Sequence, residues 1–366
     1  MDNPLISVCM PVYNAAPYLA QAIEGILSQS YSNWELIICD NKSTDSSAEI
    51  AQEYATRDRR IQFVQNQWNI GFSGNAHKTT SLAKGDFILL HAADDVASSD
   101  ALATYVATVK ASGFSEDSLV LLSDFGILDQ SGELIGTSCL DYPSVKFVAA
   151  NDETGSGSDN GTGISIETHD GQDILKDRLP TINTYGWVGT VLFSRKLLER
   201  TEGYYSNHWV NPDKYFMFKL LYINPKVIWV RKPLFQYRLH DFNQNSQQRG
   251  TGIVKYLLDQ YAFTFELPQD MLHDFAHGRE DMIHFFIEHD CLRAALREIA
   301  LGNRKSGFRH LCFGLATYPD YAWKNLKTYA AMFLWLLGPL GTLIASKAYG
   351  RYVSRNQDRF PDGPRV

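Results

Sequence analysis

The sequence lacks an excess of basic residues and lacks paired cysteines, and each absence argues against a class of protein. Its 366 residues carry 34 Lys and Arg against 41 Asp and Glu, a formal net charge of −7. A nucleic-acid-binding protein needs a basic face for phosphates, so we expect no nucleic-acid partner. The five cysteines are scattered without a Cys-X-X-Cys pair. This favours reduced thiols in a cytosolic protein over a disulfide framework.

A secretory leader and a glycine-rich phosphate loop are missing as well. Met1–Pro4 has no basic residue and the apolar run Leu5–Val12 is too short for a leader, so we expect a cytoplasmic protein. Gly71-Phe72-Ser73-Gly74 lacks the dinucleotide-binding spacing, and no Walker lysine motif occurs. These absences argue against an NAD-dependent oxidoreductase, and they mean that any nucleotide is held by other means.

Aromatic residues, by contrast, are plentiful: 20 Phe, 19 Tyr and 7 Trp make up 13% of the chain. Such a content is compatible with large cores, sugar-stacking surfaces or a membrane interface, and composition does not choose among them. The length predicts two domains, or one large domain with an appendage.

The first hundred residues alternate between strand and helix patterns. Helical spacing follows Ala16-Pro17, recurs at Ile50 and Tyr54, and extends over 71–83. Between these segments lie short apolar runs typical of buried strands: 6–12, 34–39, 61–64 and 87–90. The alternation predicts an α/β fold with a mostly parallel sheet and helices on both faces.

Polar side chains follow each predicted strand at the point where it ends. In open α/β sheets, ligands bind beyond the carboxyl ends of the strands. We therefore expect one polar rim, formed by Pro11, Tyr13, Asn14, Asp40, Asn66, Asn69, His91, Asp94 and Asp95.

The pair Asp94-Asp95 allows two interpretations. Carboxylates at a strand end suit a hard divalent cation, which accepts oxygen ligands together with water and substrate phosphates. An acidic residue here also suits the N-cap of the following helix. The pair alone leaves both open.

Taken in order, these motifs resemble glycosyltransferase family 2. The resemblance rests on Pro11-Val12-Tyr13-Asn14, Asp40-Asn41-Lys42-Ser43-Thr44-Asp45, Asn69-Ile70-Gly71, and Ala83-Lys84-Gly85-Asp86 leading to Asp94-Asp95. It covers about the first hundred residues. It implies the GT-A fold, in which a nucleotide-binding α/β half is merged with an acceptor-binding half.

The resemblance also implies roles for individual residues. Tyr13 and Asp40 would contact the base of the nucleotide, together with Pro11, Asn14 and Asn69. Asp94 matches the last aspartate of the family's Asp-X-Asp element, which holds a Mn²⁺ or Mg²⁺ ion on the donor diphosphate. Asp95 and Trp187 are further donor or acceptor candidates.

Two residues depart from the family pattern. Asn41 stands where a second aspartate is common, and Ala92 stands at the first position of Asp-X-Asp. Because Asp94 remains, we expect altered donor contacts rather than lost activity.

The second half of the predicted GT-A domain contributes the acceptor side. The domain spans 1–250, with the nucleotide-binding half at 1–100 and the acceptor half at 101–250. The polar loop 151–163 is either an acceptor-side lid or a plain surface insertion.

Three more residues of the acceptor half match family positions. An aspartate before the corresponding helix is the family's general base, so Asp213 is the candidate, with helix capping as its alternative role. The run from Phe235 to His240 resembles the family's Tyr-Arg-X-His element. Arg238 is predicted to pair with the diphosphate and His240 to contact the metal or the diphosphate.

The remaining residues are predicted to form a helical extension, 251–326, and an apolar helical segment with a basic tail, 327–366. Between Lys327 and Lys347 the sequence is uncharged but is interrupted by Gly338-Pro339. Peripheral membrane contact through 328–359, a buried helix pair and a true membrane span are all compatible with this pattern.

The resemblance predicts a metal-dependent, inverting glycosyltransferase of the hexosyltransferase type. It would move a sugar from a nucleotide-diphosphate sugar to a glycan or lipid-linked acceptor in cell-surface polysaccharide or glycolipid biosynthesis. We expect it in the cytoplasm, at the inner face of the cell membrane. A non-catalytic carbohydrate-binding or scaffold protein of the same fold, and a nucleotidyltransferase, are the alternatives.

Overall fold

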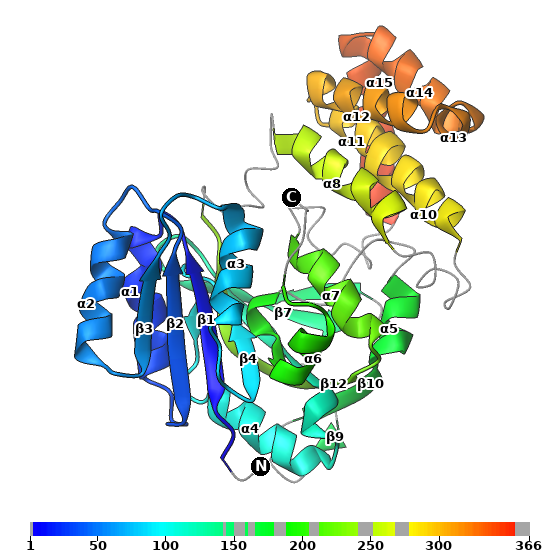
Figure 1. The fold of residues 1–366 in the computed structure, drawn as a ribbon. Helices are drawn as coiled ribbons and strands as arrows, with labels where there is room; N and C mark the ends of the chain where they lie inside the picture. The colour runs from blue at the N-terminus through cyan, green and yellow to red at the C-terminus, as the bar shows by residue number, and fades with distance from the viewer. Residues whose placement is uncertain are drawn as a thin grey trace. The chain divides into compact units, whose positions relative to one another are not determined.

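The computed structural model describes residues 3–141, 144–149, 158–159, 165–178, 188–204, 212–240, 252–267 and 278–355. The chain divides into two compact units, Met1–Arg178 with Asn183–Asn243 and Leu179–Ile182 with Gln244–Val366 (Figure 1). The predicted domain boundaries at 250 and 326 stay predictions.

The first unit begins with four parallel strands in the order β3-β2-β1-β4. They are β1 (Ile6–Val12), β2 (Trp34–Asp40), β3 (Ile61–Gln65) and β4 (Phe87–Leu90). Helices α1 (Ala16–Leu27), α2 (Ser47–Arg57) and α3 (Gly71–Ser81) connect them. The predicted alternation is confirmed, and the strands are apolar because both sheet faces are covered.

Side-chain alternation along β1 shows which helix covers which face. Ile6, Val8, Met10 and Val12 belong to the same buried cluster as residues of α1 and of α4 (Ala101–Ser112). Cys9 points the other way, and its thiol donates to the carbonyl of Thr79 in α3 at 3.7 Å. Helices therefore cover both faces, as predicted.

Beyond β4 the sheet becomes mixed. The short strand β11 (Leu192–Ser194) runs antiparallel between β4 and β6 (Leu119–Leu128), and β12 (Lys226–Arg238) pairs parallel with β6. The sheet then continues through β10 (Ser165–Asp170) to β9 (Ser158–Asp159). The remaining strands are β5 (Val96–Ala97), β7 (Leu134–Asp141) and β8 (Ser144–Ala149). The central strands are thus mostly parallel, and the fold class is confirmed.

Short helices complete this unit. Most of the predicted loop 151–163 and all of Trp187 lie outside the described residues. The helical segments after α4 are Glu116–Ser118, α5 (Gly171–Arg178), Val188–Thr190, α6 (Arg195–Arg200) and α7 (Pro212–Tyr222).

The second unit is helical in its described parts. Its core is built from apolar residues such as Leu257, Phe286, Leu292, Ile299 and Leu311. The elements are α8 (Gly252–Glu266), α10 (Arg279–Phe285), a π-helical turn over Phe286–Arg293, α11 (Ala294–Ala300), α12 (Arg304–Thr317), α13 (Pro319–Lys324), α14 (Leu326–Leu336) and α15 (Pro339–Arg355).

The uncharged C-terminal stretch forms the two helices α14 and α15. Gly338 adopts a φ of +62° between them, and Pro339 begins α15, where its missing N–H needs no partner. Within the described ranges, every helix is too short or too polar to cross a lipid bilayer.

Candidate active site

The predicted polar rim lies at one edge of the parallel strands. Val12 is paired with Asp40, and Cys9 with Leu90, so β1, β2 and β4 point their carboxyl ends the same way. The loops after these strands therefore start side by side, and each of them carries candidate residues.

Asn14 joins the loops after β1 and β2. Its backbone adopts a φ of +51°, a conformation that Asn tolerates better than most residues. Its amide N donates to Ser43 Oγ at 2.9 Å, and its Oδ1 accepts from Thr44 N at 2.8 Å. Tyr13, at the same loop, is 50% exposed. The ring is therefore available for stacking.

Asp40 is fully buried and holds its own loop together. Its Oδ2 accepts hydrogen bonds from the Ser43 amide at 3.1 Å and from Gln65 Nε2 at 3.0 Å, while its Oδ1 accepts from the Ser43 hydroxyl. The carboxylate thus shapes the 40–45 turn. Its predicted contact with the base stays a prediction.

Asn41 sits at the centre of an asparagine network. Its Nδ2 donates to Asn69 Oδ1 at 2.9 Å, and its Oδ1 accepts from Asn66 Nδ2 at 3.0 Å and from Ile70 N at 2.9 Å. An aspartate could not donate the first of these bonds. The departure from the family pattern therefore has a structural cause in this chain.

Asp94 and Asp95 have different surroundings. Asp94 Oδ2 lies 2.9 Å from His240 Nε2, and its side chain is 25% exposed. Asp95 is fully buried, and its Oδ1 accepts from the backbone N of Arg238 at 2.8 Å. Burial, and then the charge of Asp94, raise the pKa of Asp95. The structure thus separates the accessible Asp94 from the buried Asp95.

Arg238 connects this cluster to α1. Its Nε donates to the Asp94 carbonyl at 2.9 Å, and its Nη2 donates to Gln21 Oε1 at 2.6 Å. The ring of Tyr18 lies 5.0 Å from the guanidinium and 4.7 Å from the His240 ring. Because Arg238 is only 2% exposed, these contacts give it a positioning role. The predicted pairing of Arg238 with the diphosphate stays a prediction.

Sequence reasoning missed Tyr18 and Gln21. They stand three residues apart in α1 and therefore share a helix face directly after Asn14. The three-residue spacing of these two polar side chains, just after a predicted rim residue, could have identified them as candidates.

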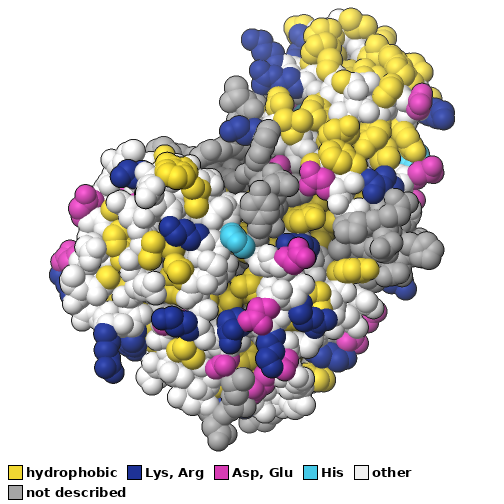
Figure 2. All heavy atoms as spheres, viewed as in Figure 1, with side chains coloured by type: hydrophobic (Ala, Val, Ile, Leu, Met, Phe, Trp, Pro, Cys, Tyr) yellow, Lys and Arg dark blue, Asp and Glu magenta, His cyan; other side chains and the backbone are white. Residues whose placement is uncertain are grey.

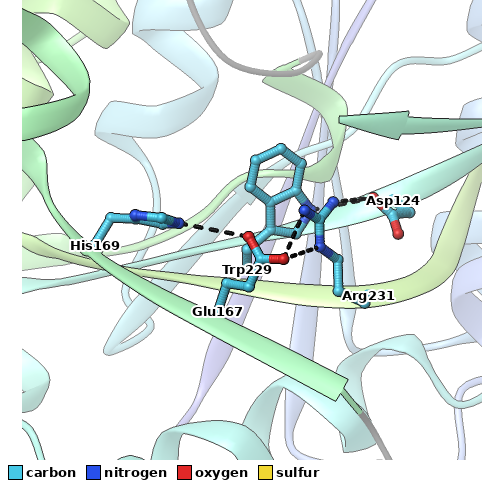
Figure 3. A network of polar contacts seen from close by, with 5 residues as sticks. All are labelled: Asp124, Glu167, His169, Trp229 and Arg231. Carbon is cyan, nitrogen blue, oxygen red and sulfur yellow. Dashed lines mark hydrogen bonds and ion pairs between the residues drawn. The ribbon is translucent and has the colours of Figure 1, made fainter. Parts of the chain in front are cut away.

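A second polar network holds the strand that delivers Arg238 (Figure 3). Arg231 of β12 donates to Glu167 of β10 at 2.8 and 2.9 Å and to Asp124 of β6 at 3.4 Å. Trp229 Nε1 donates to the same Asp124 at 3.2 Å. The β6–β12 register shifts around Pro233, which has no N–H to donate. The network fixes β12 before this bulge.

Asp213 lies in the first turn of α7 and is partly exposed. Burial, and then the charge of Asp213, raise the pKa of the buried Tyr204 hydroxyl, which places the two groups near each other. Tyr204 packs on Phe216 of α7 at 4.7 Å and against Phe72 of α3 at 6.5 Å. The candidate base is therefore part of the first unit.

Asp94 and His240 fit part of a divalent-cation site. They supply one oxygen and one nitrogen side by side, and a cation bound there would keep positions for water and phosphate oxygens. Among the described residues, no group of three or more potential ligands gathers in one place. The protein itself would therefore supply only a minority of the ligands.

Residues 7–115 match the family model described as glycosyl transferase family 2. Residues 7–115 belong to glycosyl transferase family 2. This segment contains β2 to β4, nearly all of β1 and the Asp94-Asp95 turn, so all nine residues of the predicted rim lie inside it.

One curated relative and two solved structures illustrate the similarity. The Escherichia coli "UDP-Glc:alpha-D-GlcNAc-diphosphoundecaprenol beta-1,3-glucosyltransferase WfgD" is 35% identical over 96 residues, which are 26% of this chain and 37% of the relative. The chain thus spans about a third of the length of such curated relatives.

The structures are similar over more of the chain. Staphylococcus aureus TarS 1–349 with UDP-GlcNAc has a TM-score of 0.57 at 14% identity, covering 94% of this chain and 91% of that one. The Pyrobaculum calidifontis mannosyltransferase PcManGT, solved with GDP-Man and Mn²⁺, has a TM-score of 0.50 at 14% identity, covering 91% and 87%. At such identities they establish the shared fold.

Proposed function

We propose that the protein is a metal-dependent glycosyltransferase that uses a nucleotide-diphosphate sugar and transfers the sugar with inversion. The observation that carries the proposal is the pairing of Asp94 with His240 at the carboxyl edge of a family 2 sheet. Arg238 donates to the backbone carbonyl of Asp94, and the Tyr18 ring lies against the His240 ring. The Asp94 side chain is 25% exposed, so a ligand could reach its carboxylate.

Asp94 and His240 would hold the divalent cation. Bound there, the ion would act as a Lewis acid that neutralises charge on the departing diphosphate. Tyr13 would stack on the base, and the Asp40 turn would shape the wall beside it. The side-chain oxygens of Asn14 and Asn69 already accept hydrogen bonds within the protein, from Thr44 N in the first case and from Asn41 Nδ2 and Gly71 N in the second.

Asp213 is the proposed general base. The acceptor hydroxyl oxygen forms a bond to the anomeric carbon as the bond between that carbon and the diphosphate oxygen breaks. The hydroxyl proton passes to the Asp213 carboxylate, and the electron pair leaves with the diphosphate. A single displacement of this kind inverts the anomeric configuration. The nearby Tyr204 packs on α7, which keeps the first turn of that helix in place.

The acceptor is proposed to be a glycan or a lipid-linked sugar at the inner face of the membrane. Support comes from the E. coli relative WfgD, which is named as acting on a diphosphoundecaprenol-linked sugar. The proposed setting is cell-surface polysaccharide or glycolipid biosynthesis.

A ligand panel tests the proposal. The melting temperature of the full chain is measured with UDP-, GDP- and dTDP-sugars, each with and without Mn²⁺. We expect one nucleotide to stabilise the protein more strongly when Mn²⁺ is present, because a ligand that binds only the folded state raises its stability. A uniform absence of metal-dependent stabilisation would contradict the proposal.

A further inference from the structure

Helices α14 and α15 expose an apolar surface on the second unit. On α14 the exposed residues recur at helical spacing, so they share one face, and the next helix continues it. Their exposed fractions run from 45% to 83%. We call this set the α14–α15 apolar face: Leu326, Tyr329, Phe333, Leu336, Leu340, Leu343 and Ile344. Figure 2 shows hydrophobic side chains gathered over the helices at the top of the view.

The opposite sides of the two helices are packed by small residues. Thr328, Ala331 and Ala345 are buried there. A Cβ at Gly341 would lie 1.8 Å from the Leu334 carbonyl oxygen, so the hairpin needs glycine at this approach. Other large side chains of these helices, Met332, Leu334, Trp335 and Tyr349, are partly buried against the core of the second unit, whereas those of the α14–α15 apolar face are exposed. Monomeric soluble proteins rarely leave a continuous apolar surface of this kind uncovered.

A basic pocket lies beside this face. The pocket has a volume of about 300 Å³ and is lined by Arg304, Lys305, Phe308, Arg309 and Trp335. Phe308 and Trp335 stack with ring centroids 4.3 Å apart. Arg304 Nη2 donates to the Trp335 carbonyl, while its buried Nε has no hydrogen-bond partner among the described residues. Three basic side chains, Arg304, Lys305 and Arg309, line the same pocket, which favours an anion there.

The pocket and the apolar face meet at the α14–α15 turn. A Cβ at Gly338 would lie 3.9 Å from Arg304 Nη1, so the guanidinium lies directly at the turn. Leu336 and Leu340 flank that turn and are 71% and 56% exposed. A ligand that fills both places must therefore carry an anion and an apolar body.

The distribution of charge identifies the occupant. Between Asp320 and Asp358 the sequence has no acidic residue and five basic ones, Lys324, Lys327, Lys347, Arg351 and Arg355. Lys327 is paired with Glu288 at 2.7 Å. Two copies of this chain meeting face to face would bring basic residues of the same sign together. An anionic lipid surface supplies the negative charge and the apolar phase at the same time.

We propose that the second unit docks on an anionic phospholipid bilayer, with the α14–α15 apolar face inserted and a lipid phosphate bound in the basic pocket. The docking involves no catalytic residue, so its test is independent of the test of the proposed glycosyl transfer. It would hold the enzyme at the surface where a lipid-linked acceptor resides.

Co-sedimentation of the full chain with vesicles tests the proposal. Neutral phosphatidylcholine vesicles are compared with vesicles that contain about a third phosphatidylglycerol. Leu336→Gln tests the apolar face, with Leu301→Gln as its control, because Leu301 is 58% exposed but lies outside the face. Lys305→Gln tests the pocket, with Lys255→Gln on α8 as its control, since both lysines are exposed.

We expect binding to the anionic vesicles and about tenfold or greater weakening by Leu336→Gln, the loss of one buried leucine. Lys305→Gln should weaken binding about fivefold on anionic vesicles only. Both controls should bind like the wild type. Far-ultraviolet circular dichroism checks that each variant remains folded.

Three results would overturn the proposal. The first is equal binding of the wild type to neutral and anionic vesicles, and the second is a Lys305→Gln variant that binds like the wild type. The third is a concentration-dependent dimer that Leu336→Gln abolishes, because the face would then belong to a second copy.

Discussion

Replacing Arg238 by Lys tests whether the buried guanidinium positions the Asp94–His240 pair. Lysine keeps the charge but lacks the planar fork that reaches the Asp94 carbonyl and Gln21 together. Loss of one of these charge-assisted bonds costs about 1.5–3 kcal/mol. Loss of the contact with the Tyr18 ring adds roughly 0.5–1 kcal/mol. We therefore expect the local stability around residue 238 to fall by about 3 kcal/mol.

Hydrogen exchange measures this loss where it should occur. The amide of residue 238 donates to Asp95 Oδ1 at 2.8 Å, and the amide of Leu239 donates to the Leu128 carbonyl at 2.8 Å. A fall of about 3 kcal/mol corresponds to roughly 100-fold faster exchange of these amides. Arg57→Lys is the matched control, because Arg57 is an exposed partner of Glu53. Exchange that is unchanged in Arg238→Lys would refute the positioning role.

Three further predictions concern separate parts of the chain. Asp213→Asn should lower kcat at least 100-fold and leave the affinity for the donor unchanged. The exposed control Asp117→Asn should leave kcat unchanged. A kcat of Asp213→Asn within a few fold of the wild type would show that Asp213 is not the general base. Asn41→Asp should lower the melting temperature, because about 1–3 kcal/mol is lost with the bond donated to Asn69; an unchanged melting temperature would show that the network adjusts. Burial would raise the pKa of Glu288, but hydrogen bonds from Lys327, Asn325 and Arg293 lower it to about 2. The stability that the Glu288 carboxylate contributes, about 1 kcal/mol after allowance for solvent screening of a partly exposed group, should be complete above about pH 4.3 and lost as the pH falls toward 2. An acid titration in which Glu288→Gln parallels the wild type would contradict this.

The parallel half of the fold was predictable because its signals are local. The apolar runs at 6–12 and 87–90 match β1 and β4 from end to end. Such strands are buried on both faces and so read as continuous apolar segments. The mixed half of the sheet was harder to predict, because β11 has only three residues. Its place between β4 and β6 depends on pairing with strands that are distant in the sequence.

The candidate site shows the same division. That Asp94 and Asp95 stand at a strand end follows from the sequence, but their separate surroundings depend on Arg238, 144 residues further along the chain. The asparagine network around Asn41 likewise joins the loop after β2 to the loop after β3. Pairings at such distances leave no local pattern. The uncharged stretch 328–346 predicted helices at a surface or in a core, and the outward turn of its large side chains depends on which faces the neighbouring helices occupy.

The central claim is that Asp94 supports metal-dependent transfer from a nucleotide sugar. Its most direct test is release of nucleoside diphosphate from the stabilising donor, with and without Mn²⁺, by the wild type and by Asp94→Asn. Asp117→Asn serves as the control. We expect the wild type and the control to release nucleoside diphosphate only with Mn²⁺. In Asp94→Asn the rate of release should fall at least 100-fold. Release that is independent of Mn²⁺, or unchanged in Asp94→Asn, would contradict it.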